Sequence, residues 1–188
     1  KAKEIGCENT QFRDPTGISP SNLTTPRDMA KIAEYALSFD KFREIVCKTE
    51  GTVPVSNKRG EGFEYTNTNE LLAPSELYEN PYEGYIKGVK TGWTPSAGYC
   101  FTGCMEKDGL TWISVVMGVM DSAEAADGTA IRGDLPETVS LLALTEGITA
   151  EDLDKPVNAV LIAGGIVAAV LIIGIIIFIY RKKRRREM

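Results

Sequence analysis

The stretch that decides the fold is Gly88-Val89-Lys90-Thr91-Gly92-Trp93-Thr94, which is followed by Ala97-Gly98-Tyr99. It places a cation, a hydroxyl and a position without a side chain next to one another, on what the pattern predicts to be the first strand of an antiparallel meander. The edge of such a strand can receive an extended peptide, whose terminal carboxylate the amine of Lys90 and the hydroxyl of Thr91 can bind. A phosphate-binding loop is excluded, because that motif needs Gly directly before the Lys, where Val89 stands.

The meander is predicted to continue with strands at Gly98 to Glu106 and Leu110 to Gly118. Lys107-Asp108-Gly109 between them is typical of a hairpin turn. The segment from Gly51 to Leu72 is rich in Gly, Asn and Thr and indicates a hairpin and loops.

Two helices are predicted to accompany these strands. The first begins at Thr25-Pro26-Arg27-Asp28, with a capping hydroxyl and a proline at its first position, and it ends at Phe39-Asp40. The second begins at Asp134-Leu135-Pro136-Glu137, with Gly147 as its end signal. Helical spacing predicts that the first buries Met29, Ile32, Ala33 and Ala36, and that the second turns Val139, Leu142 and Ala143 toward the sheet.

The charge is unevenly distributed along the chain. Residues 181–188 hold six cations and one acid and so carry +5, which leaves −10 for residues 1–180 out of the total of −5. An acidic main part argues against a nucleic-acid partner. Histidine is absent, which excludes a Ser-His-Asp or Cys-His arrangement in these residues and makes a zinc site unfavourable. No metal or cofactor is expected.

The four cysteines are Cys7, Cys47, Cys100 and Cys104. On one strand, Cys100 and Cys104 would be about 13 Å apart, which is too far for a disulfide. A bond between Cys7 and Cys47 stays open, although free, small hydrophobic cysteines are the favoured interpretation.

The C-terminal region predicts a membrane anchor. Val157 to Ile179 are 23 positions without a charge, and at about 1.5 Å per residue they exceed the roughly 30 Å of a bilayer's hydrocarbon core. The six cations of Arg181 to Arg186 predict a cytoplasmic C-terminus. We therefore expect a transmembrane helix at 157–180, a basic cytoplasmic tail at 181–188, a linker at 148–156 and an extracellular domain at 1–147.

The chain begins abruptly. Lys1 to Gly6 has the pattern of the last turn of a helix, with Gly6 just past its end. Neither an initiator methionine nor a signal peptide precedes it, although the predicted topology requires export. The sequence is therefore interpreted as the C-terminal piece of a longer protein.

Several segments, in order, resemble one family. Thr25–Ala33, Asn67-Thr68-Asn69-Glu70-Leu71-Leu72, Gly88–Cys100 and Ile113–Gly118 are similar to segments of the serine-type D-alanyl-D-alanine carboxypeptidases, the low-molecular-mass penicillin-binding proteins, as are Lys1–Phe12 and Asp14–Gly17. The resemblance implies an α/β (α+β) fold of the β-lactamase and DD-peptidase type, here a partial domain with an antiparallel sheet and packed helices. It covers most of residues 1–146.

The resemblance also implies roles for single residues. Lys90 would add positive potential, Thr91 would bind the terminal carboxylate of the substrate, and Gly92 would keep the strand edge clear for the peptide. Arg132 would be a second carboxylate contact, with a solvated loop charge as the alternative. Trp93 is expected at the rim of the cleft, with simple packing equally open. The candidate catalytic residues in this chain are thus Lys90, Thr91 and Gly92. The candidate substrate-binding residues are Lys90, Thr91, Arg132, Trp93 and Asn69.

The family uses Ser-x-x-Lys and Ser-x-Asn motifs besides Lys-Thr-Gly. Ser38-Phe39-Asp40-Lys41 matches the first only formally, because it is too close to Lys90 in sequence, and we expect Ser38 to be a surface serine. Tyr65-Thr66-Asn67 imitates the second in the same way. The catalytic serine and its lysine are expected to precede Lys1, so residues 1–188 alone are expected to be inactive.

The function implied is removal of the terminal D-alanine from peptidoglycan pentapeptides through an acyl-enzyme. The partners would be stem peptides ending in D-Ala-D-Ala, β-lactam antibiotics and the lipid bilayer. A β-lactamase, which would release penicillin rapidly, stays an alternative. So does a non-catalytic wall-binding or β-lactam-sensing module, which would lack the Ser-x-x-Lys motif.

Overall fold

The computed structural model describes residues 1–73, 80–124 and 128–153 of the chain. The predicted membrane segment at 157–180 and the basic tail at 181–188 lie outside the described residues, as does the end of the predicted linker. Within the described ranges, none of the helices has both the length and the apolar character that crossing a bilayer requires.

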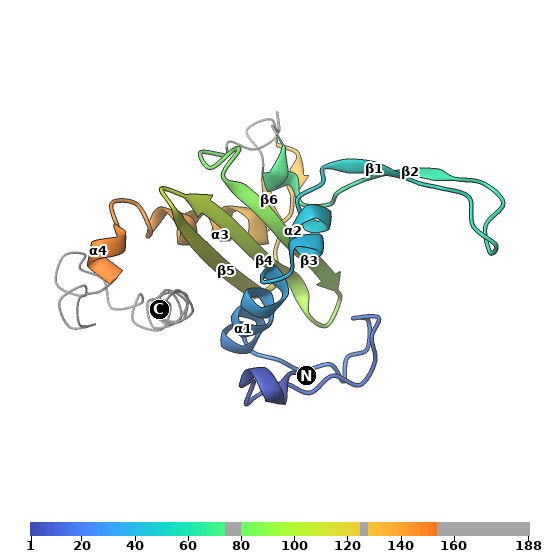
Figure 1. Cartoon of the computed structure of the whole chain (residues 1–188), viewed down its shortest axis with the longest axis horizontal. Coiled ribbons are helices and arrows are strands. Elements are labelled where there is room, and N and C mark those ends of the chain that lie inside the picture. The colour runs from blue at the N-terminus through green and yellow to red at the C-terminus, as the bar shows by residue number, and fades with distance from the viewer. Residues whose placement is uncertain (74–79, 125–127, 154–188) are drawn as a thin grey trace.

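A three-stranded antiparallel sheet with the order β3-β4-β5 forms the centre of the molecule (Figure 1). β3 is Ile86–Thr94, β4 is Gly98–Lys107 and β5 is Leu110–Val119. The predicted meander is therefore confirmed: β4 and β5 agree to within one residue at their ends, and β3 begins two residues before Gly88. Asp108 and Gly109, both with positive φ, form the turn between β4 and β5. The Lys-Thr-Gly strand β3 is an edge strand of this sheet.

Helices α1 (Pro26–Leu37) and α2 (Asp40–Val46) lie on one side of the sheet. The predicted start of α1 is confirmed, because the Thr25 hydroxyl accepts a hydrogen bond from the amide of Asp28 at 3.3 Å. The predicted end was wrong by two to three residues, since α1 stops at Leu37 and Asp40 already begins α2.

The predicted buried face of α1 was also rotated. Of its four predicted residues only Ala33 is fully buried, together with Ala30 and Leu37, whereas Met29, Ile32 and Ala36 are half-buried. The small side chains of Ala30 and Ala33 pack against Cys104 and Ile113 of the sheet. The longer Met29 and Ile32 therefore flank this contact.

Helix α3 (Asp134–Ala143) covers the opposite face of the sheet, over the larger core. Leu135 and Leu142 of α3 pack there with Phe101, Met105 and Trp112 of the strands. Val139 is half-buried against the same core, but the prediction for Ala143 was wrong, since this residue is exposed. Leu135, Thr138 and Leu142 recur three, four and seven positions apart and define the buried stripe, and Ala143 falls outside it.

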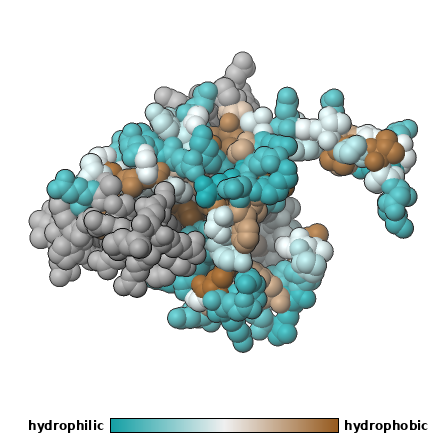
Figure 2. All heavy atoms as spheres, viewed as in Figure 1, coloured by the Kyte–Doolittle hydropathy of each residue, from teal (hydrophilic) through white to brown (hydrophobic). Residues whose placement is uncertain are grey.

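The remaining elements are short. They are η1 (Lys3–Ile5), β1 (Glu50–Val53), β2 (Phe63–Thr66), η2 (Glu70–Leu72), β6 (Ala123–Glu124), β7 (Ala130–Ile131) and α4 (Ala150–Leu153). Gly6 ends η1 in the left-handed conformation, as predicted. The hairpin of β1 and β2 confirms the prediction for residues 51–72. It extends away from the body of the molecule, and Figure 2 shows apolar side chains along it.

The N-terminal segment is attached to α1 through the buried carboxylate of Asp28. Its oxygens accept hydrogen bonds from the Thr10 hydroxyl at 2.7 Å and from the amides of Asn9 at 2.7 Å and Glu8 at 3.3 Å. Burial acts to raise the pKa of Asp28, but these hydrogen bonds and the ammonium of Lys31 outweigh it and hold the pKa below its ordinary value. Asp28 therefore stays ionised inside the fold.

Candidate active site

The strand β3 directs its two polar candidates to opposite faces of the sheet. In the β3–β4 register, Lys90 is opposite Thr102, and Thr91 is opposite Phe101. Phe101 belongs to the core under α3, and successive side chains alternate along a strand. Thr91 therefore lies on the α3 face, and Lys90 lies on the face that α1 covers.

Lys90 is exposed, and its Nζ donates a hydrogen bond to the carbonyl oxygen of Thr91 at 2.6 Å. The ammonium group thus folds back along its own strand and places a positive charge at the edge of the sheet. A cation in this position can attract an anionic group of a ligand that approaches β3.

The hydroxyl of Thr91 is largely covered. Thr91 is only 6% exposed, and its Oγ1 lies 2.6 Å from Oγ1 of Thr68 in the loop before η2. Thr68 itself is exposed. Sequence reasoning missed Thr68, although it stands in the middle of the Asn-Thr-Asn segment that carried part of the family resemblance.

Asn69, a predicted substrate contact, is buried and caps η2. Its Oδ1 accepts a hydrogen bond from the amide of Leu71 at 3.2 Å, and it is 2% exposed. Its Nδ2 is buried without a hydrogen-bond partner among the described residues. The side chain of Asn69 is therefore covered from solvent, next to Thr68 in the same loop.

Arg132 lies directly beside Gly92. Its Nη2 donates to the carbonyl oxygens of Gly92 at 3.0 Å and Cys100 at 3.3 Å, which joins the segment before α3 to the ends of β3 and β4. The same guanidinium forms two hydrogen bonds with Asp134, which is fully buried at the start of α3. The predicted alternative, a solvated loop charge, does not describe this residue, whose side chain is 18% exposed.

Two aromatic residues stand beside this cation. The guanidinium carbon of Arg132 lies 5.1 Å from the ring centroid of Tyr99, and the ring of Trp93 lies 6.2 Å from that of Tyr99. Trp93 is 55% exposed, so simple packing in the core, one of its two predicted roles, does not apply. It lies at the exposed end of β3, next to Thr91, Gly92 and Arg132.

Neither imitation of a catalytic motif forms a hydrogen bond to Lys90, Thr91 or Arg132 among the described residues. Ser38 is exposed and donates to the carbonyl oxygen of Tyr35 at 2.6 Å, and Lys41 pairs with Glu44 at 2.8 Å. The prediction that Ser38 is a surface serine is confirmed. Thr66 is an exposed residue of β2, and the Asn67 amide group donates to the carbonyl oxygen of Lys48 at 2.8 Å.

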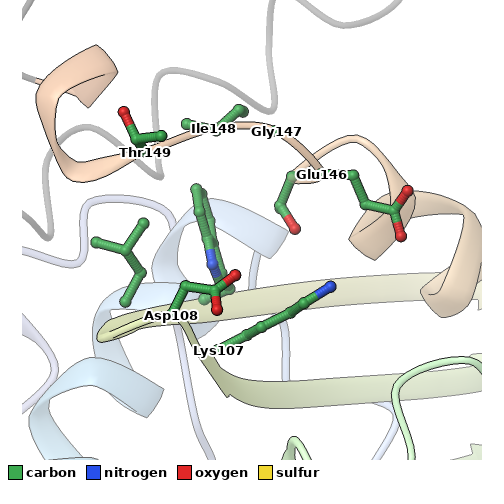
Figure 3. A pocket seen from close by; sticks show the side chains of 9 residues that line it. Lys107, Asp108, Glu146, Gly147, Ile148 and Thr149 are labelled. Atoms are coloured by element: carbon green, nitrogen blue, oxygen red, sulfur yellow. The ribbon is translucent and has the colours of Figure 1, made fainter.

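A hollow of about 530 Å³ lies elsewhere, between the β4–β5 turn and the segment after α3 (Figure 3). Lys107 and Asp108 border it on one side, and Glu146 and Thr149 on the other. The β3–β4 register pairs Ile86 with Met105 close to this turn and Gly92 with Cys100 farther along. The hollow therefore lies at the end of the sheet opposite Gly92 and Arg132, and it is not part of the candidate site.

The chemistry of the cluster is that of an anion-binding strand edge. It combines two cations, two hydroxyls and an open glycine, and none of the described residues form a group of three or more His, Cys, Asp or Glu suited to a metal. The four cysteines are free thiols, as the sequence favoured.

Comparison with known proteins identifies the family of the chain. Residues 1–121 match the model of peptidase family S11, described as D-alanyl-D-alanine carboxypeptidase. The chain belongs to the D-alanyl-D-alanine carboxypeptidase family. A relative, the D-alanyl-D-alanine carboxypeptidase DacF of Bacillus subtilis, is 34% identical over 127 residues, which are 66% of this chain and 30% of that protein. A D-alanyl-D-alanine carboxypeptidase of a Streptomyces species is 34% identical over 69% of this chain and 44% of its own length.

Solved structures of proteins similar to this chain share its fold. A variant of a Streptomyces DD-transpeptidase has a TM-score of 0.53 and 33% identity, over 62% of this chain and 43% of its own. Penicillin-binding protein D2 of Listeria monocytogenes, solved with cefotaxime bound, has a TM-score of 0.52 and 25% identity. The match covers 74% of this chain and 50% of that protein. The fold is thus of the α+β DD-peptidase type, and the chain spans 30% to 50% of the length of these relatives.

Proposed function

We propose that the protein is a serine-type D-Ala-D-Ala carboxypeptidase that removes the terminal D-alanine from peptidoglycan stem peptides. The observation that carries the proposal is the edge of β3, where Lys90, Thr91 and Gly92 lie beside the guanidinium of Arg132. Family membership over residues 1–121 supports it.

The described residues would bind and orient the substrate. An extended peptide would lie along β3, where Gly92 has no side chain to obstruct it. Arg132 and the hydroxyl of Thr91 would bind its free carboxylate, and Lys90 would supply positive potential. Attack on the penultimate D-Ala carbonyl would come from the serine of a Ser-x-x-Lys motif expected before Lys1, which forms an ester that water then hydrolyses.

We further propose that the enzyme acts outside the cell as a single-pass membrane protein. The support is the uncharged run from Val157 to Ile179, followed by six cations. The bilayer would then be a partner of the enzyme, and β-lactams would be its inhibitors.

The test uses the protein expressed from its complete gene. Incubation with diacetyl-Lys-D-Ala-D-Ala should release D-alanine, and a fluorescent penicillin should label the protein covalently and remain bound. The peptide ending in L-Ala-L-Ala is the matched control and should not be cleaved. Absence of both D-alanine release and labelling would refute the proposal, whereas rapid turnover of penicillin would favour a β-lactamase.

A further inference from the structure

The hydroxyl that meets solvent at the Lys-Thr-Gly strand belongs to Thr68. Thr91 is 6% exposed and Thr68 is exposed, while their Oγ1 atoms are 2.6 Å apart. A ligand that approaches β3 from solvent therefore meets Thr68 in front of the hydroxyl of Thr91.

The proton count of this pair allows an outward donor on Thr68. Each hydroxyl has one proton and two acceptor lone pairs, and one proton lies between the two oxygens. If Thr91 donates to Thr68, the proton of Thr68 remains available on the exposed side. If Thr68 donates instead, the remaining proton lies on the covered Thr91. An approaching carboxylate selects the first arrangement, because only that one offers it a donor.

The loop holds Thr68 in this place through the asparagines on either side. The amide of Asn69 donates to Oδ1 of Asn67 at 2.9 Å, and the amide of Asn67 donates to the carbonyl oxygen of Thr49 at 2.7 Å. Asn69 also caps η2, which packs beside β3. Because both neighbours use their side chains to fix the backbone, the side chain of Thr68 is positioned before a ligand arrives.

A positive charge stands close to the threonine pair. Arg132 donates through Nη2 to the carbonyl oxygen of Gly92, the residue directly after Thr91. Its Nε and Nη2 are occupied by Asp134, Gly92 and Cys100, whereas its Nη1 group makes no hydrogen bond with the described residues. Arg132 can therefore supply charge-assisted donors to the carboxylate that the threonine pair binds.

We propose that Thr68 is a further substrate-binding residue, whose hydroxyl donates a hydrogen bond to the free terminal carboxylate and thereby contributes to carboxypeptidase specificity. This inference rests on the proposed function. Thr91 then acts largely through Thr68, as the hydrogen-bond donor behind it, while Arg132 provides the charge.

The test compares Thr68→Val, Thr68→Ser and Thr66→Val in the protein expressed from its complete gene. Thr68→Val keeps the shape and removes the hydroxyl, Thr68→Ser keeps the hydroxyl, and Thr66→Val changes an exposed threonine two positions earlier on β2. Each is assayed with diacetyl-Lys-D-Ala-D-Ala and with the same peptide carrying a C-terminal amide.

Loss of a hydrogen bond to a charged group should raise KM for the acid roughly 10- to 100-fold in Thr68→Val. KM for the amide should be unchanged, and Thr68→Ser and Thr66→Val should behave like the wild type. An equal rise in KM for acid and amide, or no rise for either, would overturn the inference.

A binding measurement separates this inference from the proposed function. A wild type that releases no D-alanine contradicts the function, but the affinity for the uncleaved acid peptide still tests Thr68. Calorimetry should then show weaker binding by Thr68→Val than by Thr66→Val, and equal affinities would overturn the role of Thr68.

Discussion

The guanidinium of Arg132 is held by the carboxylate of Asp134 through two parallel hydrogen bonds, from Nε to Oδ1 at 3.1 Å and from Nη2 to Oδ2 at 2.7 Å. Asp134 is fully buried at the first position of α3. The pair fixes the plane of the guanidinium and gives the buried carboxylate of Asp134 a hydrogen-bonded counter-ion. It therefore joins the helix that covers the larger core to the carbonyl of Gly92 on the candidate substrate strand.

We predict that Asp134→Asn impairs both stability and carboxylate binding. An amide neutralises no charge and places donors opposite the donors of Arg132, so the free energy of unfolding should fall by about 3 kcal/mol. KM for diacetyl-Lys-D-Ala-D-Ala should rise as the guanidinium loses its fixed orientation. Urea unfolding and steady-state kinetics measure both effects. Glu137→Gln, an exposed acid in the first turn of the same helix, is the control and should leave both unchanged. Wild-type stability of Asp134→Asn would contradict this account.

Much of the fold was predictable because local signals determine it. The residue pattern along each strand and the turn residues between strands were sufficient to predict β3, β4 and β5. Thr25-Pro26 correctly marked the start of α1. The rotation of α1 was not predictable from hydropathy, because close packing on the sheet favours the small Ala30 and Ala33 over the more apolar Met29 and Ile32. That preference depends on the shape of the opposing surface, which the helix sequence does not contain.

The candidate site was predictable in part. Lys90, Gly92 and Arg132 were identified, and the structure brings Gly92 and Arg132 into direct contact across 40 positions of sequence. Thr68 was missed because its hydroxyl meets Thr91 only after the loop has folded against β3. The two flanking asparagines were a usable signal, since Asn side chains that bind the backbone favour a fixed turn.

A second prediction concerns pH and Asp28. Its folded-state pKa lies below the ordinary value of 3.8, so its contribution to stability is complete above that pH and is lost as the pH falls through the folded-state pKa. Asp28→Asn should therefore lower the unfolding free energy by about 2 kcal/mol at pH 7 and by progressively less below about pH 4. Urea midpoints at pH 7 and pH 3 test this. Asp40 is an exposed acid at the start of α2, and Asp40→Asn should lower the unfolding free energy at pH 7 much less than Asp28→Asn does. A constant difference for Asp28→Asn across this range would refute the linkage.

Alanine substitutions at two glycines of the sheet should distinguish an effect on ligand binding from an effect on stability. A Cβ added at Gly92 would lie 3.8 Å from Cys100, an ordinary contact, so Gly92→Ala should keep its melting temperature within a few degrees. The methyl group would stand on the candidate substrate strand, and penicillin labelling should slow. At Gly103 the added Cβ would collide with Ser114 and approach Phe101 to 2.8 Å, so Gly103→Ala should lose stability. Unaltered labelling of a folded Gly92→Ala protein would argue against an open edge at this position.

The cysteines should differ in their reactivity toward thiol reagents. Burial raises the pKa of Cys104 to about 12, with a smaller contribution from Glu106, and burial also raises the pKa of Cys7. Only thiolates react readily. At pH 8 iodoacetamide should label the exposed Cys47 first, and Cys7 and Cys104 only in urea. Peptide mass spectrometry locates the labels, and rapid labelling of Cys104 in the native protein would contradict its burial.

Replacement of Lys90 tests the charge at the strand edge. Lys90 is exposed, and its ammonium contacts the carbonyl of Thr91, so Lys90→Met should leave the melting temperature nearly unchanged. Acylation by a fluorescent penicillin should slow at least tenfold, because the positive potential beside the ligand is removed. Lys87→Met is the matched control: it lies three positions earlier on the same strand, where its Nζ donates to the carbonyl of Gly84 at 2.8 Å. It removes an equal charge and should keep the wild-type rate. Equal slowing in both variants would indicate that net charge, rather than the position of Lys90, controls acylation, whereas the wild-type rate in Lys90→Met would remove this residue from the site.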